Sequence, residues 1–342
     1  TAFLLAVLFM VLGFYPFGAH SILTSDLAAQ YAPDLVAYKQ KLLSGGNLSY
    51  SFLIGMGKNT MGIFAYYLSS PLNFLTFLFP TDRISEAILV LITLKLSLSS
   101  AFLTLFLRKR FHSTSGYAVL FGVLYAFSSY TMVYMINIMW LDGLLLLPLL
   151  LFLIERYLEN KKRWPLLTLT LLVLFVSGFY IAYMAGIFSF LYLIYRLFEE
   201  RRFAVDTRKE AGKSIIVFIG CAVLAAAMSM AVLLPAGLDV LRNPDHTASS
   251  FELDSNFKFI AFLNQLLTGS FDSLSNNKPL IYCGLPVLFL IVLFFLNPYF
   301  AKRQKWMTGG VLVFFLLSFN LSFLDLAWQL FDSPNWFQYR YS

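Results

Sequence analysis

The sequence predicts an all-α polytopic membrane protein, and three observations carry that prediction. Hydrophobic residues make up 59% of the 342 residues, charged residues make up 13%, and the mean hydropathy is +0.74. A soluble globular domain carries about 25% charged residues. Phe, Tyr and Trp reach 18%, which is typical of proteins with many interfacial aromatic side chains. Lys and Arg stand in short runs between apolar segments, so the net charge of +7 indicates membrane topology, and we expect no nucleic-acid partner.

Nine apolar runs approach the length of about 20 residues that a transmembrane helix needs. They cover residues 2–17, 84–107, 117–136, 143–157, 166–179, 181–198, 214–234, 280–296 and 308–321. The fifth and sixth runs join into one apolar stretch, which as a single helix would be roughly 50 Å long and too long for one span. We therefore expect a break at residues 177–180, where Gly178 permits a turn.

The basic runs assign a side of the membrane to each loop. With nine spans, the runs at 108–110, 161–163, 201–209 and 302–305 all fall on one side, which the positive-inside rule makes the cytoplasm. The first span then runs outward. We expect residues 18–83 and 236–279 to form exterior loops of one transmembrane domain, residues 1–342. The chain has no initiator Met and no closing span, so we expect it to be a fragment of a longer chain.

The exterior loop at 18–83 is far longer than a connector. Apolar residues recur at near-helical spacing over 26–43 and 64–79, which predicts two interfacial helices lying flat over an outward-facing cavity. We expect Ser25 to cap the first helix, Gly45 to end it and Pro71 to interrupt the second. The polar stretch 50–60 between them is suited to contacting sugar hydroxyls.

Two acids are candidate catalytic residues. Asp26 follows the first span, where a carboxylate can act as general base on a lipid-borne substrate; the alternative is an acid that complements a helix dipole. Asp142 opens the fourth span, and the same two interpretations apply. We expect the two carboxylates to reach one substrate, with a divalent cation between them as a further option.

Four residues are candidates for binding substrate: Lys95, Arg340, Tyr31 and His246. Lys95 lies halfway along its span, where a cation either anchors an anionic group or forms a structural pair. Arg340 stands among aromatic residues and is either an interface anchor or a clamp on a carrier phosphate. Tyr31 belongs to the stripe of the first interfacial helix. His246 follows Asp245 in a polar loop. The two residues either form a catalytic pair in which His246 is the base, or contribute to a weak metal site, or belong to a solvated loop.

Several strings give the chain a resemblance to the bacterial membrane protein family YfhO. They are Ser21-Ile22-Leu23-Thr24-Ser25-Asp26, Gln30-Tyr31-Ala32-Pro33, Lys41-Leu42-Leu43-Ser44-Gly45-Gly46, Tyr66-Tyr67-Leu68-Ser69-Ser70-Pro71-Leu72-Asn73, Leu147-Pro148-Leu149, Ile154-Glu155-Arg156, Ser250-Phe251-Glu252-Leu253, Ile281-Tyr282-Cys283-Gly284 and Tyr339-Arg340-Tyr341-Ser342. The resemblance covers essentially the whole chain.

The resemblance implies a GT-C-like bundle and a glycosyltransferase of the bacterial cell membrane with its active site facing the exterior. It implies a polyprenyl-phosphate sugar donor, namely an undecaprenyl-phosphate-linked sugar. It also implies a cell-wall polymer such as lipoteichoic acid as acceptor. The base of that class would fall on Asp26. The alternative function is a transporter or flippase of lipid-linked sugars, in which polar groups would gather near the midplane. A scaffold for cell-wall assembly is a third interpretation.

Overall fold

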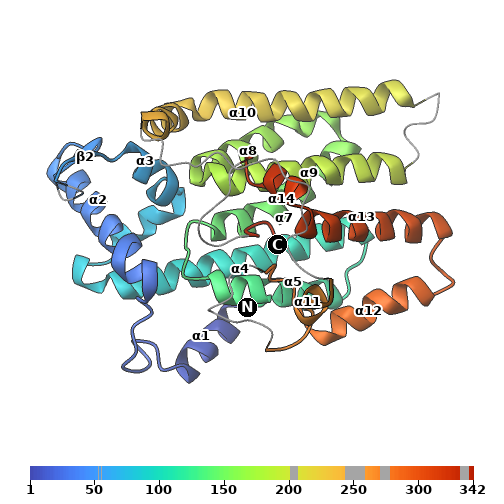
Figure 1. Cartoon of the computed structure of the whole chain (residues 1–342), viewed down its shortest axis with the longest axis horizontal. Coiled ribbons are helices and arrows are strands. Elements are labelled where there is room, and N and C mark those ends of the chain that lie inside the picture. The colour runs from blue at the N-terminus through green and yellow to red at the C-terminus, as the bar shows by residue number, and fades with distance from the viewer. Residues whose placement is uncertain (53, 55, 201–206, 243–258, 270–277, 332–338) are drawn as a thin grey trace. The chain divides into compact units, whose positions relative to one another are not determined.

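The computed structural model describes all residues except 53, 55, 201–206, 243–258, 270–277 and 332–338, and the described chain is mostly helical (Figure 1). It divides into two compact units. Unit 1 comprises residues 1–126, 133–182 and 219–244, and unit 2 comprises residues 127–132, 183–218 and 245–342. The all-α class that the composition predicts is therefore confirmed for the described residues.

Unit 1 is built around a long central helix, α4. Its apolar helices and the turn beside them are α1 (Ala2–Val11), α4 (Ile84–Phe111), α5 (Tyr117–Ala126), α7 (Leu141–Glu159), η5 (Lys161–Arg163) and α8 (Trp164–Ser177). Helix α4 packs against α1, α5 and α7, and α7 packs in turn against α8. Buried Leu, Ile and Ala side chains fill these contacts, among them Leu91, Ile92, Leu150 and Leu171. Polar side chains are buried in unit 1 as well, among them Lys95, Asp142, Glu155 and Thr168.

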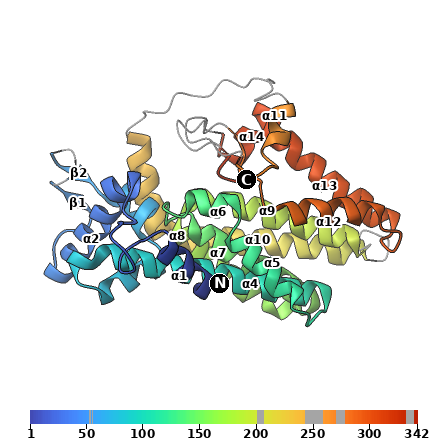
Figure 2. The same ribbon diagram turned by 90° about the horizontal axis from the view of Figure 1, so that it is seen from below.

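Short helices and one hairpin connect α1 to α4. They are η1 (Leu27–Tyr31), α2 (Ala32–Ser44), β1 (Tyr50–Ser51), β2 (Lys58–Asn59), α3 (Met61–Ile63), η2 (Phe64–Leu68), η3 (Pro71–Leu78) and η4 (Thr81–Arg83). The strands are antiparallel, with Tyr50 opposite Asn59 and Ser51 opposite Lys58. Figures 1 and 2 show this segment gathered at one end of α4, α7 and α8.

The two helices expected in this segment are present, with different details. Ser25 does not cap the first one: its φ is +49°, and the helix begins after Asp26 without a side-chain cap. Gly45 ends α2 in the left-handed conformation, as expected. The second helix is interrupted at Ser70, whose extended backbone is the conformation that a following proline favours. The sequence did not predict the hairpin within 50–60.

Both halves of the segment contain a wide helical turn. The amide of Ala32 donates to the carbonyl of Leu27, and the amide of Ser69 donates to the carbonyl of Phe64, so η1 and η2 are π-helical. Such turns contain one residue more than an α-helical turn and are frequent at functional sites. Here they carry the tyrosines of the site, Tyr31 in the first and Tyr66 and Tyr67 in the second.

Lys39 joins the two halves of the segment. Its side chain is buried, and its ammonium donates to the carbonyls of Thr76 and Phe79 at the end of η3 and lies 5.8 Å from the ring centre of Phe77. The ammonium thus adds a donor at the end of η3, both for the Phe79 carbonyl and for the Thr76 carbonyl, which also accepts from the amide of Phe79. Asn73 and Thr76 are buried as well, so η3 packs into unit 1 with one side.

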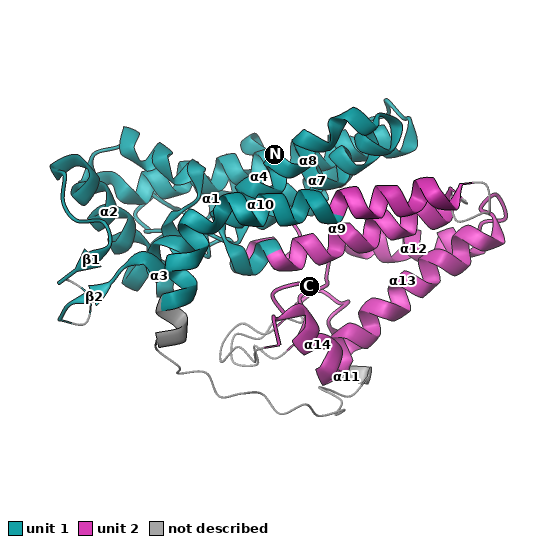
Figure 3. Ribbon diagram, turned by 90° about the horizontal axis from the view of Figure 1, so that it is seen from above, with its two compact units in different colours: residues 1–126, 133–182, 219–244 teal, residues 127–132, 183–218, 245–342 magenta. Residues whose placement is uncertain are grey.

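Unit 2 contains most of the later helices (Figure 3). In chain order they are α6 (Ser129–Tyr134), α9 (Phe179–Glu199), α10 (Arg208–Arg242), α11 (Phe259–Asn264), α12 (Leu285–Leu296), α13 (Lys302–Asn320) and α14 (Ser322–Trp328); α6, α9 and α10 each belong partly to unit 1. Tyr341 stacks on Phe319 and Trp328, and its hydroxyl donates to Asp325 at 2.8 Å. This aromatic cluster ties the last described residues to α13 and α14.

Each of the nine expected spans overlaps one or two of these helices, but α1 ends at Val11 within the span expected at 2–17, and α12 begins at Leu285 within the span expected at 280–296. Among the described residues, four segments are long and apolar enough to cross a membrane: Thr81–Phe111, Tyr117–Tyr134, Phe179–Glu199 and Arg208–Leu238. Helices α1 and α12 are apolar but have 10 and 12 residues, short of the ~20 that a bilayer requires. The expected break is present, because α8 ends at Ser177 and α9 begins at Phe179.

The loop expected at 236–279 begins later than the sequence suggested. Helix α10 continues through Pro235 to Arg242, and α11 forms within the loop. A proline inside a membrane helix is tolerated where other groups satisfy the released carbonyl.

The contact between α5 and α4 depends on Gly122. A Cβ at this position would come within 2.5 Å of the Ser100 carbonyl oxygen and of Thr104 Oγ1, whereas a Cβ at Gly220 in α10 would meet nothing within 4 Å. We expect Gly122→Ala to destabilise the protein by ~1–3 kcal/mol, the usual cost of overpacking. Gly220→Ala should be neutral or stabilising by up to ~1 kcal/mol, because Ala favours helices. Thermal unfolding in detergent measures both effects. Equal melting temperatures would show that α4 and α5 can move apart enough to accommodate the added methyl group.

Candidate functional site

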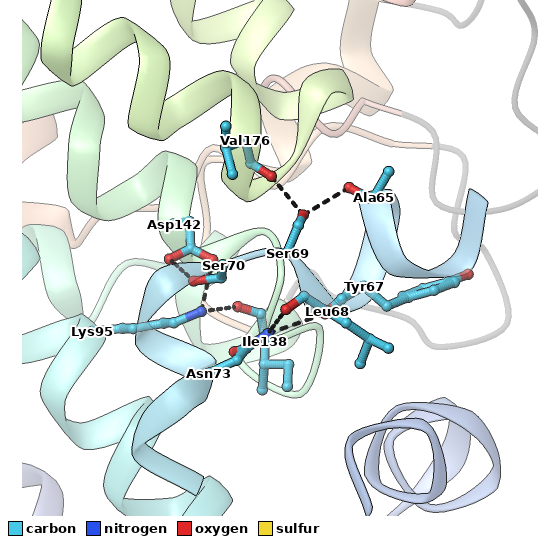
Figure 4. A network of polar contacts seen from close by, with 10 residues as sticks. All are labelled: Ala65, Tyr67, Leu68, Ser69, Ser70, Asn73, Lys95, Ile138, Asp142 and Val176. Carbon is cyan, nitrogen blue, oxygen red and sulfur yellow. Dashed lines mark hydrogen bonds and ion pairs between the residues drawn. The ribbon is translucent and has the colours of Figure 1, made fainter. Parts of the chain in front are cut away.

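A buried ion pair lies between α4 and α7 (Figure 4). Lys95 Nζ is 2.7 Å from Asp142 Oδ2, and the two residues are 0% and 3% exposed. An isolated charge in an apolar interior is costly, and removing one member of such a pair leaves the other without compensation. Each charge is therefore held in place by the other.

Neighbouring polar groups complete this pair. Lys95 Nζ also donates to the carbonyl of Ile138 at 2.9 Å, and Ser70 Oγ donates to Asp142 Oδ1 at 3.0 Å. Asp142 lies in the first turn of α7, where the helix dipole favours an acid. The pair thus joins α4 and α7 to the loop before α7 and to the serine that precedes η3.

The turn between η2 and η3 is fixed to the same region. Ser69 Oγ contacts the carbonyls of Ala65 at 3.0 Å and Val176 at 2.5 Å, and Asn73 Nδ2 donates to the carbonyls of Tyr67 and Leu68 (Figure 4). Ser69, Ser70 and Asn73 are all buried. Their residue types did not identify these three as site residues in the sequence. The one signal was the string Ser69-Ser70-Pro71-Leu72-Asn73, which contributes to the family resemblance.

Asp26 belongs to a tyrosine-rich cluster. The Tyr31 hydroxyl is 3.5 Å from Asp26 Oδ2 and 3.1 Å from Asn137 Oδ1, so it bridges the carboxylate and the amide. The Tyr31 ring stacks on Tyr67 with ring centres 5.1 Å apart, and Tyr66 meets Tyr67 edge-on at 4.6 Å. Asp26 itself is partly exposed, and no Lys or Arg of the described chain forms an ion pair with it.

The tyrosines are proton donors at physiological pH. Burial raises the pKa of the Tyr31 hydroxyl far above its usual range, and the neighbouring Tyr67 and the Asp26 charge add to the effect. Burial also raises the pKa of Tyr67 to about 12. Both hydroxyls therefore stay neutral and can donate to a carboxylate or to a substrate oxygen.

One chain of contacts connects the two candidate acids. Tyr31 reaches from Asp26 to the side chain of Asn137, and Lys95 reaches from Asp142 to the carbonyl of Ile138, the next residue along the loop. The loop before α7 is thus held from both sides. Within unit 1, the structure brings Asp26, Tyr31, Lys95 and Asp142 into one polar network, in which Asp142 is compensated by a cation and Asp26 is not.

The other expected site residues lie elsewhere. Arg340 belongs to unit 2, where its carbonyl accepts a hydrogen bond from Tyr130 at 2.9 Å. His246 lies outside the described residues. No group of three or more His, Cys, Asp or Glu side chains suited to a metal ion occurs in the part of the chain that the structure describes.

Comparison with known proteins identifies one family. The family described as bacterial membrane protein YfhO matches residues 1–342. No curated protein and no solved structure matches the chain.

The buried pair predicts a clear pattern of stabilities. Lys95→Met and Asp142→Leu should each destabilise the protein by ~3–5 kcal/mol, because each leaves an uncompensated buried charge. The double variant should recover most of that loss, since no charge then remains buried. Thermal unfolding of the four proteins gives the coupling free energy.

The control is the ion pair between Lys109 and Glu159, which joins the same two helices at a more exposed position. Lys109→Met and Glu159→Leu should each cost less than ~1 kcal/mol. Equal effects at the two pairs would contradict the assignment of Lys95 and Asp142 as the pair that holds the site.

Proposed function

Because this chain belongs to the YfhO family of bacterial membrane proteins, we propose that it is the membrane part of a GT-C-type glycosyltransferase. The reaction moves a sugar from an undecaprenyl-phosphate-linked donor to an exterior cell-wall polymer such as lipoteichoic acid. The apolar helices agree with a place in the bacterial membrane. The active site in this proposal is the network around Asp26, and the proposal places it on the exterior side, as the positive-inside rule favours.

The unequal surroundings of the two acids carry the proposal. The charge of Asp142 is compensated by Lys95 and covered by Ser70, whereas Asp26 is partly exposed and its described side-chain contact is a neutral tyrosine. A general base must be ionised, accessible and within reach of the proton that it removes. Of the two acids Asp26 is the accessible one, which favours it as the base, whereas the buried Asp142 is suited to hold the surrounding chain in place.

The residues then have the following roles. Asp26 takes the proton of the acceptor hydroxyl as that oxygen attacks the anomeric carbon of the donor sugar. The bond from this carbon to the carrier phosphate breaks, and its electron pair leaves with the phosphate oxygen. Tyr31 orients the Asp26 carboxylate by its hydroxyl. Through Asn137 and Ile138, Lys95 and Asp142 fix the loop on which Tyr31 rests.

Asp26→Asn tests the base directly. General-base catalysis contributes ~10²–10⁴-fold to a rate, so we expect sugar transfer in proteoliposomes to fall by that factor. The melting temperature should be nearly unchanged, because the one side-chain hydrogen bond of Asp26 within the described residues is long, at 3.5 Å to Tyr31. The matched control is Asp82→Asn, which removes an exposed acid of the same connecting segment and should leave transfer intact.

The same assay separates transfer from transport. Labelled sugar that appears on an added polymer supports a transferase. Labelled lipid-linked sugar that only changes leaflet, equally in wild type and Asp26→Asn, would instead identify a flippase and overturn the proposal.

Arg340 provides a second test, on the donor side. We propose that its guanidinium binds the carrier phosphate, because a guanidinium matches phosphate oxygens with two parallel hydrogen bonds. A charge-assisted contact of ~1.5–3 kcal/mol predicts a loss of at least ~10-fold in kcat/KM for Arg340→Ala. Arg340→Lys should recover only part of it, because the fork is lost. Steady-state kinetics with varied donor measure this, and unchanged values would leave Arg340 as an interface anchor.

A further inference from the structure

Unit 2 contains an apolar slot between α9 and α13, with a volume of about 560 Å³. One wall is formed by α9 and the other by α13. The lining is mostly aromatic and aliphatic, and its polar groups are Arg303, Thr308 and the hydroxyls of Tyr192 and Tyr195. The size lies within the range of ~300–1,000 Å³ that is typical of ligand sites.

Both ends of the slot are defined by contacts. At one end the rings of Phe188 and Phe315 lie 5.9 Å apart, and at the other Arg303 donates to the carbonyl of Phe198. Ten residues separate Phe188 from Phe198, so the slot is about 15 Å long at ~1.5 Å per helical residue. This length equals half of the ~30 Å hydrocarbon core of a bilayer, the depth of one leaflet.

The Arg303 end has the character of a headgroup site. Lys302 and Lys305 lie on the same first turns of α13, and Trp306 is 81% exposed, as is typical of aromatic residues at a membrane interface. The acids nearby, Glu199 and Glu200, are both held by Arg196 at 2.6 and 2.7 Å. The local charge that remains is positive, and it complements a phosphate.

We propose that the slot binds an anionic glycerophospholipid of the cytoplasmic leaflet, with one acyl chain between α9 and α13 and its phosphate at Arg303. The basic run at 302–305 is cytoplasmic by the positive-inside rule, on the face opposite the proposed reaction. The site is therefore distinct from the one that would hold the phosphate of the exterior sugar donor.

Two substitutions test the chain and headgroup parts separately. Gly310 lines the slot, and a Cβ built on it meets nothing within 4 Å, so Gly310→Leu fills the slot without a backbone clash. Arg303→Gln removes the cation. The controls are Gly220→Leu, an open glycine position in α10, and Arg163→Gln, a cation of another basic run.

The measurement is native mass spectrometry of the whole chain in mild detergent, titrated with palmitoyl-oleoyl phosphatidylglycerol or with phosphatidylcholine of the same acyl chains. We expect the first phosphatidylglycerol to bind about 10-fold more tightly than phosphatidylcholine, as one charge-assisted contact predicts. Arg303→Gln should abolish this preference and Arg303→Lys should keep part of it. Gly310→Leu should weaken both lipids by about 10-fold, and the two controls should bind like wild type.

Three results would overturn the proposal. They are wild-type binding of both lipids by Gly310→Leu, an undiminished headgroup preference in Arg303→Gln, and displacement of phosphatidylglycerol by polyprenyl phosphate at equal concentration. The last would assign the slot to the carrier lipid. None of these results bears on the transfer assay of Asp26→Asn, so the two proposals stand or fall independently.

Discussion

The candidate site depends on one buried ion pair. Lys95 and Asp142 come from α4 and α7, the two central helices of unit 1, and neither charge is tolerable in the interior without the other. The groups that complete the pair are a carbonyl of the loop before α7 and the hydroxyl of Ser70. The contact that compensates the two buried charges therefore also positions two connecting segments. One of them is the loop before α7, which Tyr31 contacts through Asn137, and Tyr31 in turn contacts Asp26.

The pair also explains why the connecting segment enters the bundle. Lys95 is eleven residues into α4, which places the start of α7 roughly 16 Å along that helix. The turn at Ser69 and Ser70 reaches the start of α7 through Asp142, and η3, whose Asn73 and Thr76 are buried, packs on α4. The polar backbone of these short turns is satisfied by serine and asparagine side chains and by Lys39, as a low-dielectric surrounding requires.

Much of the fold could be predicted from single residues with local effects. Gly45 and Pro71 each end or interrupt a helix where the sequence predicts it, because their backbone preferences act within one turn; the break at Gly178 is also where it was expected, although its φ of 169° does not require glycine. The depth of Lys95 was also predictable from its place in an apolar run. Its partner was not, since Asp142 lies 47 residues away and the sequence offers an equally good local role for that acid. The positive φ of Ser25, which excludes it as a cap, and the hairpin at 50–59 were not predicted from the sequence either. The catalytic role of Asp26, the carrier contact of Arg340 and the orientation of the site stay predictions.

The π-helical turn at Leu27–Tyr31 has a consequence for how this site tolerates changes in chain length. Because that turn holds one residue more than an α-helical turn, deleting a single residue from it would restore ordinary helical spacing while α2 stayed in place. A wide turn closes about the same rotation as an α-helical turn with one residue fewer, so the residues before the deletion would keep their orientation and Asp26 would stay on the face that Tyr31 and Asn137 share. The wide turn thus absorbs one residue locally, and a sequence that lacks the extra residue but keeps the aspartate would encode the same placement of position 26.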